Sequence, residues 1–171
     1  DGARAAELTL KDTPTTLIAT DALPVLEHAV DAGIAAVCAD MSGAAQAAFD
    51  LAMDYLRTRK QFGRLIGENQ ALRHRASEML VSLEMARSMA MAAAVAADDA
   101  SAEDSAPDLH RAKLSVARNA RNVALGAIQL HGGIGMTEEY AVGHYLRRIH
   151  VLDQMFGDAD VHAARLAAAL L

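Results

Sequence analysis

The sequence predicts an all-α protein: an up-down four-helix bundle with an extra C-terminal helix, preceded by a short β segment. Apolar residues recur at every third or fourth position through long stretches, as they do along the buried face of a helix. Short breaks separate these stretches, and long helices joined by short loops pack antiparallel. Hydrophobic residues make up 53% of the chain and aromatic residues only 4%, so alanine-rich helix faces are expected to pack closely.

The N-terminal part of the chain combines a β signal with the longest helical pattern. Residues 6–20 are rich in threonine, leucine and isoleucine, which favours one or two short strands. A helical pattern then runs to about residue 59, with Asp21 as a candidate N-cap and Pro24 in the first turn. Gly33 and Gly43 lower helix propensity, so each is expected to mark close packing against a neighbouring helix.

Three further long helical stretches follow, and a short fifth helix ends the chain. The acidic, serine-containing stretch 98–108 is predicted to be a solvated loop. The glycines of "HGGIG" end another helical pattern, because glycine favours helix termini over helix interiors. The helices are therefore expected over residues 69–97, 109–130 and 137–155, and from residue 158 onward.

Polar side chains near two of these helix starts suit a positive helix end. Thr137, Glu138 and Glu139 are expected at the start of the fourth helix, where acidic side chains are favourable. Asp158 directly follows Gly157 and is a candidate N-cap of the fifth helix.

Length, charge and cysteine content limit the class of protein. The chain has 171 residues, which suits one domain or slightly more, and its net charge of −6 argues against nucleic-acid binding. Cys38 is the single cysteine and lies in an apolar pattern, so we expect a buried thiol in a reducing, cytoplasmic setting. No membrane-spanning run is expected. The opening "DGARAAELTL" leads us to expect a segment of a longer protein.

The first chemical motif is "RTRKQFGRLIGENQ", residues 57–70. Phe62 stands beside Gly63 in a turn rather than in an apolar stripe, which makes it a candidate ligand contact. Clustered cations at a helix end either offset the helix dipole as solvated side chains or bind an anion, and both interpretations stay open. The cations are Arg57, Arg59, Lys60 and Arg64.

The second motif is "AIQLHGGIGMTEEY", residues 127–140. Its glycines permit backbone geometry that other residues avoid, so backbone amides there are able to face a phosphate or an adenine edge. Gln129 and His131 flank the turn and are candidate side-chain donors. No strand precedes the glycines and their spacing is wrong for a dinucleotide fingerprint, and an ordinary helix–loop–helix connection explains them equally well.

The two motifs together are highly specific. "YLRTRKQFGRLIGENQALRHRASEML", followed later by "AIQLHGGIGMTEEYAVGHYLRR", resembles the C-terminal helical domain of the acyl-CoA dehydrogenase family. The match in order, spacing and residue type extends over about residues 8–171. The resemblance implies that residues 1–20 are the end of the family's middle β-domain and residues 21–171 the helical bundle domain.

The resemblance implies an FAD-dependent oxidoreductase of fatty acid metabolism, which oxidises an acyl-CoA between Cα and Cβ. In this family the helical bundle forms the oligomer core, so a homo- or hetero-oligomer is expected. The electrons are expected to pass to an electron-accepting flavoprotein or another acceptor. Neither nucleic acid nor a metal ion is expected as a partner.

Cofactor contacts are carried over by position from the family. Arg59 matches the arginine that reaches the FAD pyrophosphate, usually that of the neighbouring subunit, and a bidentate guanidinium suits this group. The other matching residues lie beside the flavin or at the adenosine end: Gln61, Phe62, Asn69, Gln70, Gln129, Leu130, His131, Gly132 and Gly133.

The family's catalytic base has no counterpart at the matching positions. The base is a glutamate after the fourth helix, and aligning Arg147 and Gly157 places Phe156 there. Some relatives carry the base on the first helix, at a position that is Gly33 here, with Ile34 replacing a common neighbouring arginine. Neither position offers a carboxylate to remove the α-proton.

Three alternatives follow from the missing base. Asp158, two residues further on, is a tentative substitute base, although an N-cap explains it better. A partner subunit of a mixed oligomer is able to supply the base, and "FGDADVH" resembles the small subunit of pimeloyl-CoA-type dehydrogenases. A catalytically silent structural subunit is the third. A metal site from Asp158, Asp160 and His162 is not expected, because these positions of a helix do not converge.

Overall fold

The computed structural model describes residues 2–98 and 105–169. Five α-helices carry the fold within these residues, together with a two-stranded hairpin and two 3₁₀ turns. Their bounds are α1 Leu23–Thr58, β1 Lys60–Gln61, β2 Arg64–Leu65, η1 Ile66–Glu68, α2 Gln70–Asp98, α3 Ser105–His131, η2 Gly132–Met136, α4 Val142–Gln154 and α5 Ala159–Ala168.

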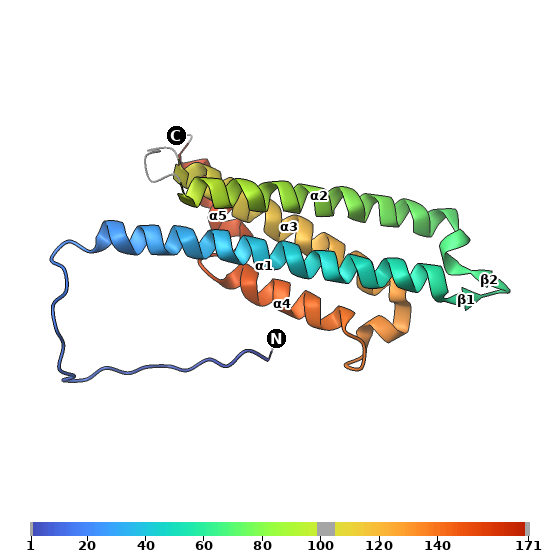
Figure 1. Cartoon of the computed structure of the whole chain (residues 1–171), viewed down its shortest axis with the longest axis horizontal. Helices are drawn as coiled ribbons and strands as arrows, with labels where there is room; N and C mark the ends of the chain where they lie inside the picture. Colours follow the sequence, from blue (N-terminus) through green and yellow to red (C-terminus); the bar gives the residue numbers. More distant parts are fainter. Residues whose placement is uncertain (1, 99–104, 170–171) are drawn as a thin grey trace.

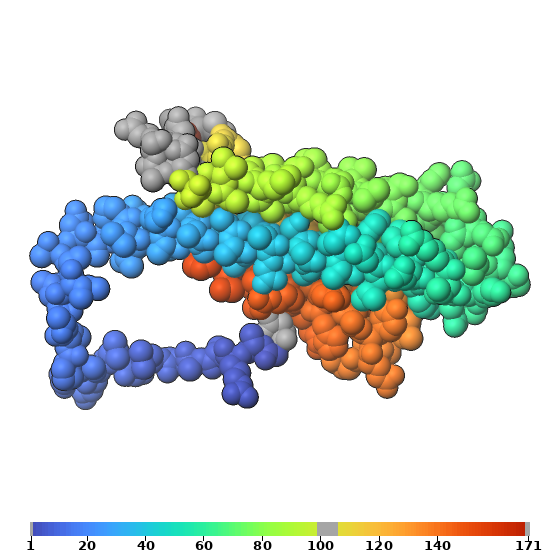
Figure 2. Space-filling model, viewed as in Figure 1, coloured from blue at the N-terminus to red at the C-terminus, as the bar shows by residue number. Residues whose placement is uncertain are grey.

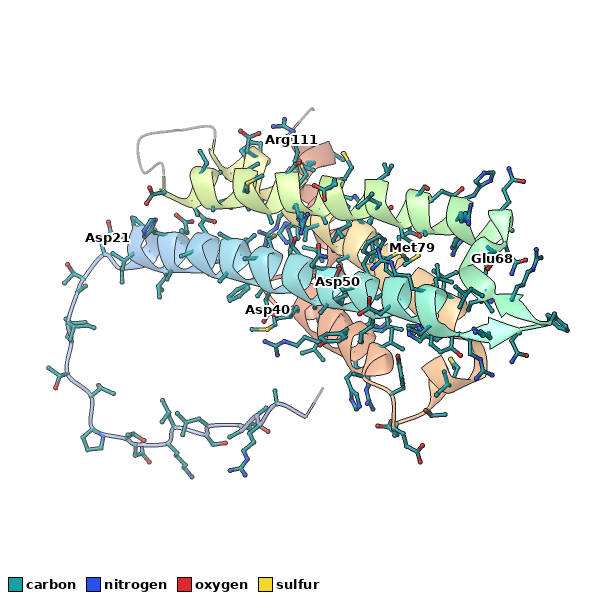
Figure 3. The ribbon with its side chains drawn as sticks, turned by 45° about the vertical axis from the view of Figure 1, so that its right-hand side comes forward. Asp21, Asp40, Asp50, Glu68, Met79 and Arg111 are labelled. Atoms are coloured by element: carbon teal, nitrogen blue, oxygen red, sulfur yellow. The ribbon has the colours of Figure 1, made fainter. Side chains whose placement is uncertain are left out.

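The four long helices form the predicted up-down bundle. The helices α1 and α3 contact each other at its centre, α2 packs against both on one side, and α4 packs against both on the other (Figure 1). The short α5 packs on α3 at the end where α1 begins, and the hairpin lies at the opposite end (Figure 1). Asp21 and Glu68 mark these two ends (Figure 3). The expected bundle with an extra C-terminal helix is therefore confirmed.

Small side chains allow the helices of the bundle to approach closely, as the composition predicts. A Cβ on Gly126 of α3 would lie 2.7 Å from Sδ of Met79 on α2, so a larger residue there would require the Met79 side chain to move. The buried alanines are Ala44, Ala45, Ala48 and Ala52 on α1, Ala86, Ala90 and Ala93 on α2, and Ala112, Ala117, Ala120, Ala124 and Ala127 on α3.

The predicted start of α1 is corrected by one residue. Ala22 is the N-cap and makes no side-chain capping bond, so the expected Asp21 cap is wrong. Pro24 lies in the first turn as predicted, where its missing N–H costs no hydrogen bond. Of the two glycines expected at close contacts, Gly33 meets another side chain, whereas Gly43 has nothing within 4 Å of an added Cβ.

The β structure lies elsewhere than expected. Residues 2–20 are exposed and contain no strand among the described positions, and they run outside the bundle (Figure 2). A strand needs a partner to satisfy its backbone groups, and no described segment lies alongside this one. The strands β1 and β2 instead pair antiparallel, with Lys60 opposite Leu65. The assignment of residues 1–20 to a β-domain stays a prediction.

The other helix bounds agree with the sequence except at two starts. The helix α3 begins earlier than expected, at Ser105, while residues 99–104 of the predicted acidic loop lie outside the described residues. Residues 137–141 form a turn, so α4 begins at Val142 rather than 137. Glu138 does not stabilise the helix start, because Arg147 donates to both of its carboxylate oxygens at 2.7 and 2.8 Å.

Two helices have the length and composition of a membrane span, although no such run was expected. Mean hydropathy over the most apolar stretch is 1.2 in α1 and 1.4 in α2. Core helices of soluble proteins pass the same test, and half of the α1 stretch is buried within the bundle. The α2 stretch is 22% buried, so most of it faces outward. Length and composition alone are weak evidence for a span.

Candidate functional site

The basic motif forms the hairpin at one end of the bundle. Phe62 and Gly63 make its tip, and both have positive φ angles, of 52° and 78°. The Phe62 side chain is fully exposed, at 101% of its reference area, with no neighbour to cover it. An exposed phenylalanine held by a tight turn is a surface that a ligand or another subunit is able to cover.

The cations of this hairpin differ in how they are held. Arg64 donates to Oδ1 of Asn69 at 2.5 Å, so these two predicted residues fix one another across the end of the hairpin. Arg59 and Lys60 are exposed and make no ion pair with any residue of the described ranges. Their charges are therefore available to an anion, whereas Arg57 lies 3.5 Å from Asp54.

The glycine motif lies at the same end of the bundle. The His131 ring is buried, stacks on Tyr55 of α1 at 4.6 Å and lies 4.8 Å from the Tyr140 ring. Its Nδ1 donates to the carbonyl of Ala127 at 2.7 Å. The ring therefore fixes the end of α3, and its buried Nε2 has no hydrogen-bond partner among the described residues. The role of His131 as a side-chain donor to a ligand stays a prediction.

The backbone of the glycine turn is uncovered, whereas the Leu130 and His131 side chains before it are buried. An added Cβ on Gly132, whose φ is 66°, or on Gly133 would meet nothing within 4 Å. Leu130 is buried, whereas Gln129 is exposed beside the turn. The turn thus offers an uncovered backbone and one amide side chain to an approaching group. Such a surface suits contact with a nucleotide.

Cations, an aromatic ring and a bare glycine backbone thus occur together within one end of the bundle. Tyr55 joins them, because it stacks on His131 and lies one helical turn before Arg59, whose N–H donates to its carbonyl at 2.9 Å. A pyrophosphate needs cations and backbone amides, and an adenine ring needs a flat or bare surface. The residues present fit a flavin adenine dinucleotide.

The two expected base positions meet at the other end of the bundle. Gly33 of α1 faces the Phe156 ring, and an added Cβ on Gly33 would lie 2.5 Å from Cζ of that ring. Phe156 itself has a φ of 61° and ends the turn after α4. The structure therefore brings two positions 123 residues apart in the sequence into contact, and neither carries a carboxylate.

Asp158 caps the last helix. Its Oδ1 accepts the backbone N–H groups of Asp160 and Val161 at 3.1 and 2.9 Å. This is the geometry of an N-cap, which satisfies otherwise unpaired amides at the start of α5. The capping prediction is confirmed.

A buried lysine lies beneath the same turn. Lys113 of α3 is fully buried, and its Nζ donates to the carbonyls of Asp153 at 2.7 Å, Gly157 at 3.1 Å and Leu152 at 3.3 Å. The Asp153 carboxylate lies 3.6 Å away. Burial lowers the pKa of Lys113, and the charge of Asp153 opposes that shift.

Two histidines pair beside this lysine. Nδ1 of His162 on α5 lies 3.1 Å from Nδ1 of His110 on α3, so one ring donates to the other. Burial lowers the pKa of the fully buried His162 to about 4, and the charges of His110 and Lys113 act in the same direction. His162 therefore packs as a neutral ring, and no group of three metal-binding side chains forms within the described ranges.

Sequence reasoning missed both of these buried groups. Lys113 lies between Leu109 and Val116 on the apolar face of α3. The spacing of these three residues could have predicted that the Lys113 side chain is buried. No sequence pattern pairs His110 with a residue on a later helix, so its contact with His162 could not be predicted. The expected burial of Cys38 is confirmed, and burial raises the pKa of its thiol to about 12.

The two ends of the bundle are far apart. Gly33 and Arg59 lie 26 residues apart along one helix and its cap, which corresponds to about 39 Å at the rise of an α-helix. One dinucleotide does not extend over that length. The hairpin end and the Phe156 end of one chain are therefore too far apart to contact the same dinucleotide.

Comparison with known proteins defines the class. The family model described as "Acyl-CoA dehydrogenase, C-terminal domain" matches residues 23–171. The chain belongs to the acyl-CoA dehydrogenase family and represents its C-terminal domain. Most of the matching relatives are named acyl-CoA dehydrogenases, which are FAD-dependent oxidoreductases acting on the CH–CH group, and a 3-sulfinopropanoyl-CoA desulfinase also matches. The expected family, enzyme class and cofactor are therefore confirmed at the level of the family.

Individual relatives agree with this assignment. The chain is 31% identical to the probable acyl-CoA dehydrogenase YngJ of Bacillus subtilis, over 84% of this chain and 37% of the relative. It is 33% identical to the acyl-CoA dehydrogenase IpdE2 of Mycolicibacterium smegmatis, over 77% of this chain and 40% of the relative. The structure of a variant of the Tcur3481-Tcur3483 steroid ACAD is similar, with a TM-score of 0.76 and 29% identity, over 82% of this chain and 38% of the other. The chain thus spans about two fifths of the length of its relatives.

Proposed function

We propose that this chain is the C-terminal, cofactor-contacting and oligomerising part of an enzyme that oxidises an acyl-CoA thioester between Cα and Cβ. The observation that carries the proposal is the meeting of the free Arg59, the exposed Phe62 and the bare glycine turn at one end of the bundle. These features suit the pyrophosphate and adenosine parts of FAD. When bound, the flavin accepts a hydride from the substrate.

The residues of this chain would hold and orient the cofactor. The Arg59 guanidinium offers two parallel N–H donors to the pyrophosphate, and Gln61 and Phe62 stand beside it on the hairpin. Asn69 holds Arg64, while Gln70 opens α2. The adenosine end would rest on Gln129, Leu130, His131, Gly132 and Gly133, of which the glycine backbone and Gln129 are exposed.

The source of the base decides between two forms of this function. A self-sufficient enzyme would use Asp158, which the α5 cap already engages. A partner-dependent subunit would leave proton removal to a carboxylate of another chain, and the packing of Phe156 on Gly33 favours this alternative. Both positions that carry a base among relatives, Gly33 and Phe156, lack a carboxylate here. The positions proposed to contact the cofactor, in contrast, keep the residue types of the family's motifs. The similar Tcur3481-Tcur3483 steroid ACAD is named by two components.

We propose that the protein acts in the cytoplasm as a homo- or hetero-oligomer and passes electrons to an electron-accepting flavoprotein or another acceptor. Exposed apolar side chains on α2 support assembly through the bundle, because a monomer would leave them in water. They are Leu80, Val81, Met85, Met91 and Val95, and each is at least 44% exposed.

Substitution of Arg59 tests the cofactor assignment. In the full-length assembly, Arg59→Ala should lower the ratio of bound flavin to protein after purification, because the pyrophosphate loses a bidentate cation. Visible absorbance of the flavin against protein absorbance measures this ratio. Arg57→Ala is the matched control, since Arg57 lies two residues away but pairs with Asp54. Equal flavin content in Arg59→Ala and the control would refute the assignment.

The source of the base is tested by mixing subunits. The full-length protein alone and with any co-purifying acyl-CoA dehydrogenase subunit would be given butyryl-, octanoyl- and palmitoyl-CoA in separate anaerobic titrations. Flavin bleaching only in the presence of a second subunit with a glutamate at the position of Phe156 supports the partner-dependent form. Bleaching by the single protein supports the self-sufficient form, and a protein without flavin contradicts both.

A further inference from the structure

The turn between α4 and α5 holds an unusual backbone conformation. Phe156 and Gly157 follow one another with φ angles of 61° and 98°. Glycine adopts such angles freely, but a residue with a Cβ is strained there. A phenylalanine remains there only where its surroundings determine the conformation. What holds this turn therefore also decides where the side chain at position 156 points.

Lys113 bridges the two sides of this turn. Its ammonium has three N–H donors, and three carbonyls surround it, those of Leu152, Asp153 and Gly157, at 2.7 to 3.3 Å. The first two belong to the last turn of α4, and the third comes directly after Phe156. One buried cation thus joins the end of the helix to the far side of the turn, with Phe156 between its contacts.

A lysine in this place is costly unless it has such a role. The Lys113 side chain is fully buried in the low-dielectric core. Removing a cation from water costs free energy even where a carboxylate lies nearby. An apolar side chain of similar size would fill the same volume without that cost. It would not, however, satisfy three carbonyls whose orientation the turn requires.

We propose that Lys113 is a positioning residue for the acyl-CoA site: it fixes the turn that lays the side chain at position 156 on Gly33. The link to the acyl-CoA site rests on the proposed function, while the link from Lys113 to position 156 does not. Phe156 is the group that acts on Gly33, and Lys113 acts through it. In a relative with a carboxylate at this position, the same turn geometry would aim that carboxylate at α1.

A fluorine probe tests the positioning directly. 4-Fluorophenylalanine is placed at position 156 of the full-length assembly, alone or with Lys113→Met, and ¹⁹F spectra are compared with that of the urea-unfolded protein. We expect Lys113→Met to move the resonance most of the way to the unfolded value. Arg121→Met, at an exposed position of the same helix, should leave it unchanged. A second sample labelled at Phe49, which is half-buried in the bundle, reports whether the fold is intact.

An unchanged resonance at position 156 in folded Lys113→Met would overturn the proposal. If Lys113→Met does not fold, as seen from the Phe49 probe, Lys113→Gln takes its place. Its amide has two donors for three carbonyls, so a partial movement of the resonance is expected, and no movement again overturns the proposal.

Steady-state kinetics test the consequence for the site. With whichever of butyryl-, octanoyl- and palmitoyl-CoA the wild type oxidises, Lys113→Met and Phe156→Ala should each raise KM, by about tenfold, while flavin content stays normal. The double variant should be no worse than either single one, because both changes remove the same contact. Additive effects would contradict the coupling. An assembly that oxidises none of the three substrates counts against the proposed function, while the fluorine spectra still decide the role of Lys113.

Discussion

At the scale of single residues, Gly33 and Phe156 compete for the same space, so the residue at one position limits which residues fit at the other. The ring occupies the space that any side chain at position 33 would need, since an added Cβ comes within 2.5 Å of it. The ring is also able to lie there only because α1 has no side chain at that point. This pair explains a glycine in the middle of a long helix, where glycine costs about 1 kcal/mol relative to alanine.

A double-mutant cycle measures this exclusion. Gly33→Ala alone should leave the free energy of unfolding nearly unchanged, because the gain in helix propensity is offset by displacement of the ring. In a Phe156→Ala background the same substitution should stabilise the chain by about 1 kcal/mol. Urea unfolding of the four variants gives the coupling. Equal effects of Gly33→Ala in both backgrounds would show that the two residues do not compete for space.

The two roles considered for Asp158 are separated by two substitutions. Asp158→Asn keeps a capping oxygen, so both the unfolding free energy and flavin reduction by acyl-CoA should stay near normal. Asp158→Ala removes the cap and should lower the unfolding free energy by about 1 kcal/mol. Loss of flavin reduction by orders of magnitude in Asp158→Asn would instead identify the aspartate as the base.

At the scale of elements, α5 is joined to α3 by a pair of neutral histidines. His162 and His110 exchange a hydrogen bond that needs at least one unprotonated ring. The charged groups around the pair are Lys113 on α3, Arg165 on α5 and Asp31 on α1, and of these only Asp31 favours a protonated ring. A hydrogen bond with the backbone of Phe156 also raises the pKa of His162, but less than burial lowers it. Burial is the largest cause of the lowered pKa of each histidine.

The attachment of α5 should therefore weaken in acid. The pKa of folded His162 is about 4, against an ordinary value of 6.5, so the unfolded chain binds the proton first as pH falls. The contribution of the pair is fully present above pH 6.5 and should be lost between 6.5 and about 4. Urea unfolding across this range measures the loss. His162→Phe should flatten the pH dependence, whereas His28→Gln, at an exposed position of α1, should not.

At the scale of the whole molecule, the length of α1 separates the hairpin end of the bundle from the Phe156 turn. The hairpin and glycine turn offer cofactor contacts at one end, and the Phe156 turn lies about 39 Å away along the helix. One dinucleotide does not reach both ends, so under the proposed function each end would contribute to a different site. The chain spans 37% and 40% of the length of two relatives.

Assembly through α2 is the prediction at this scale. Met91 is 65% exposed on an apolar face of α2, and burying such a face between subunits favours association. Met91→Lys in the full-length protein should lower the oligomeric state, measured by light scattering after gel filtration. Circular dichroism shows whether the helices remain. An unchanged oligomeric state would place the subunit contact elsewhere on the bundle.

The sequence by itself determined the helices, because their apolar periodicity is a local property. It predicted α2 to within one residue at each end, and it predicted the cap of α5 at Asp158 from the preceding glycine. It also identified the two motifs and the family, since the order and spacing of residues are fully present in the chain. The starts of α1 and α4 were misplaced, because a polar residue near a helix start is a weak signal when tertiary contacts such as Glu138–Arg147 compete for it.

Only the tertiary structure decided which distant residues meet. Contacts between helices depend on packing that no local pattern records, so the chain alone did not place Phe156 on Gly33, Lys113 beneath the turn or His162 against His110. The tertiary structure also buries the His131 side chain and leaves the glycine backbone as the exposed part of the motif at residues 127–140. The periodicity of a helix tells which of its faces is buried, whereas the identity of the neighbour on that face follows from how the whole bundle closes.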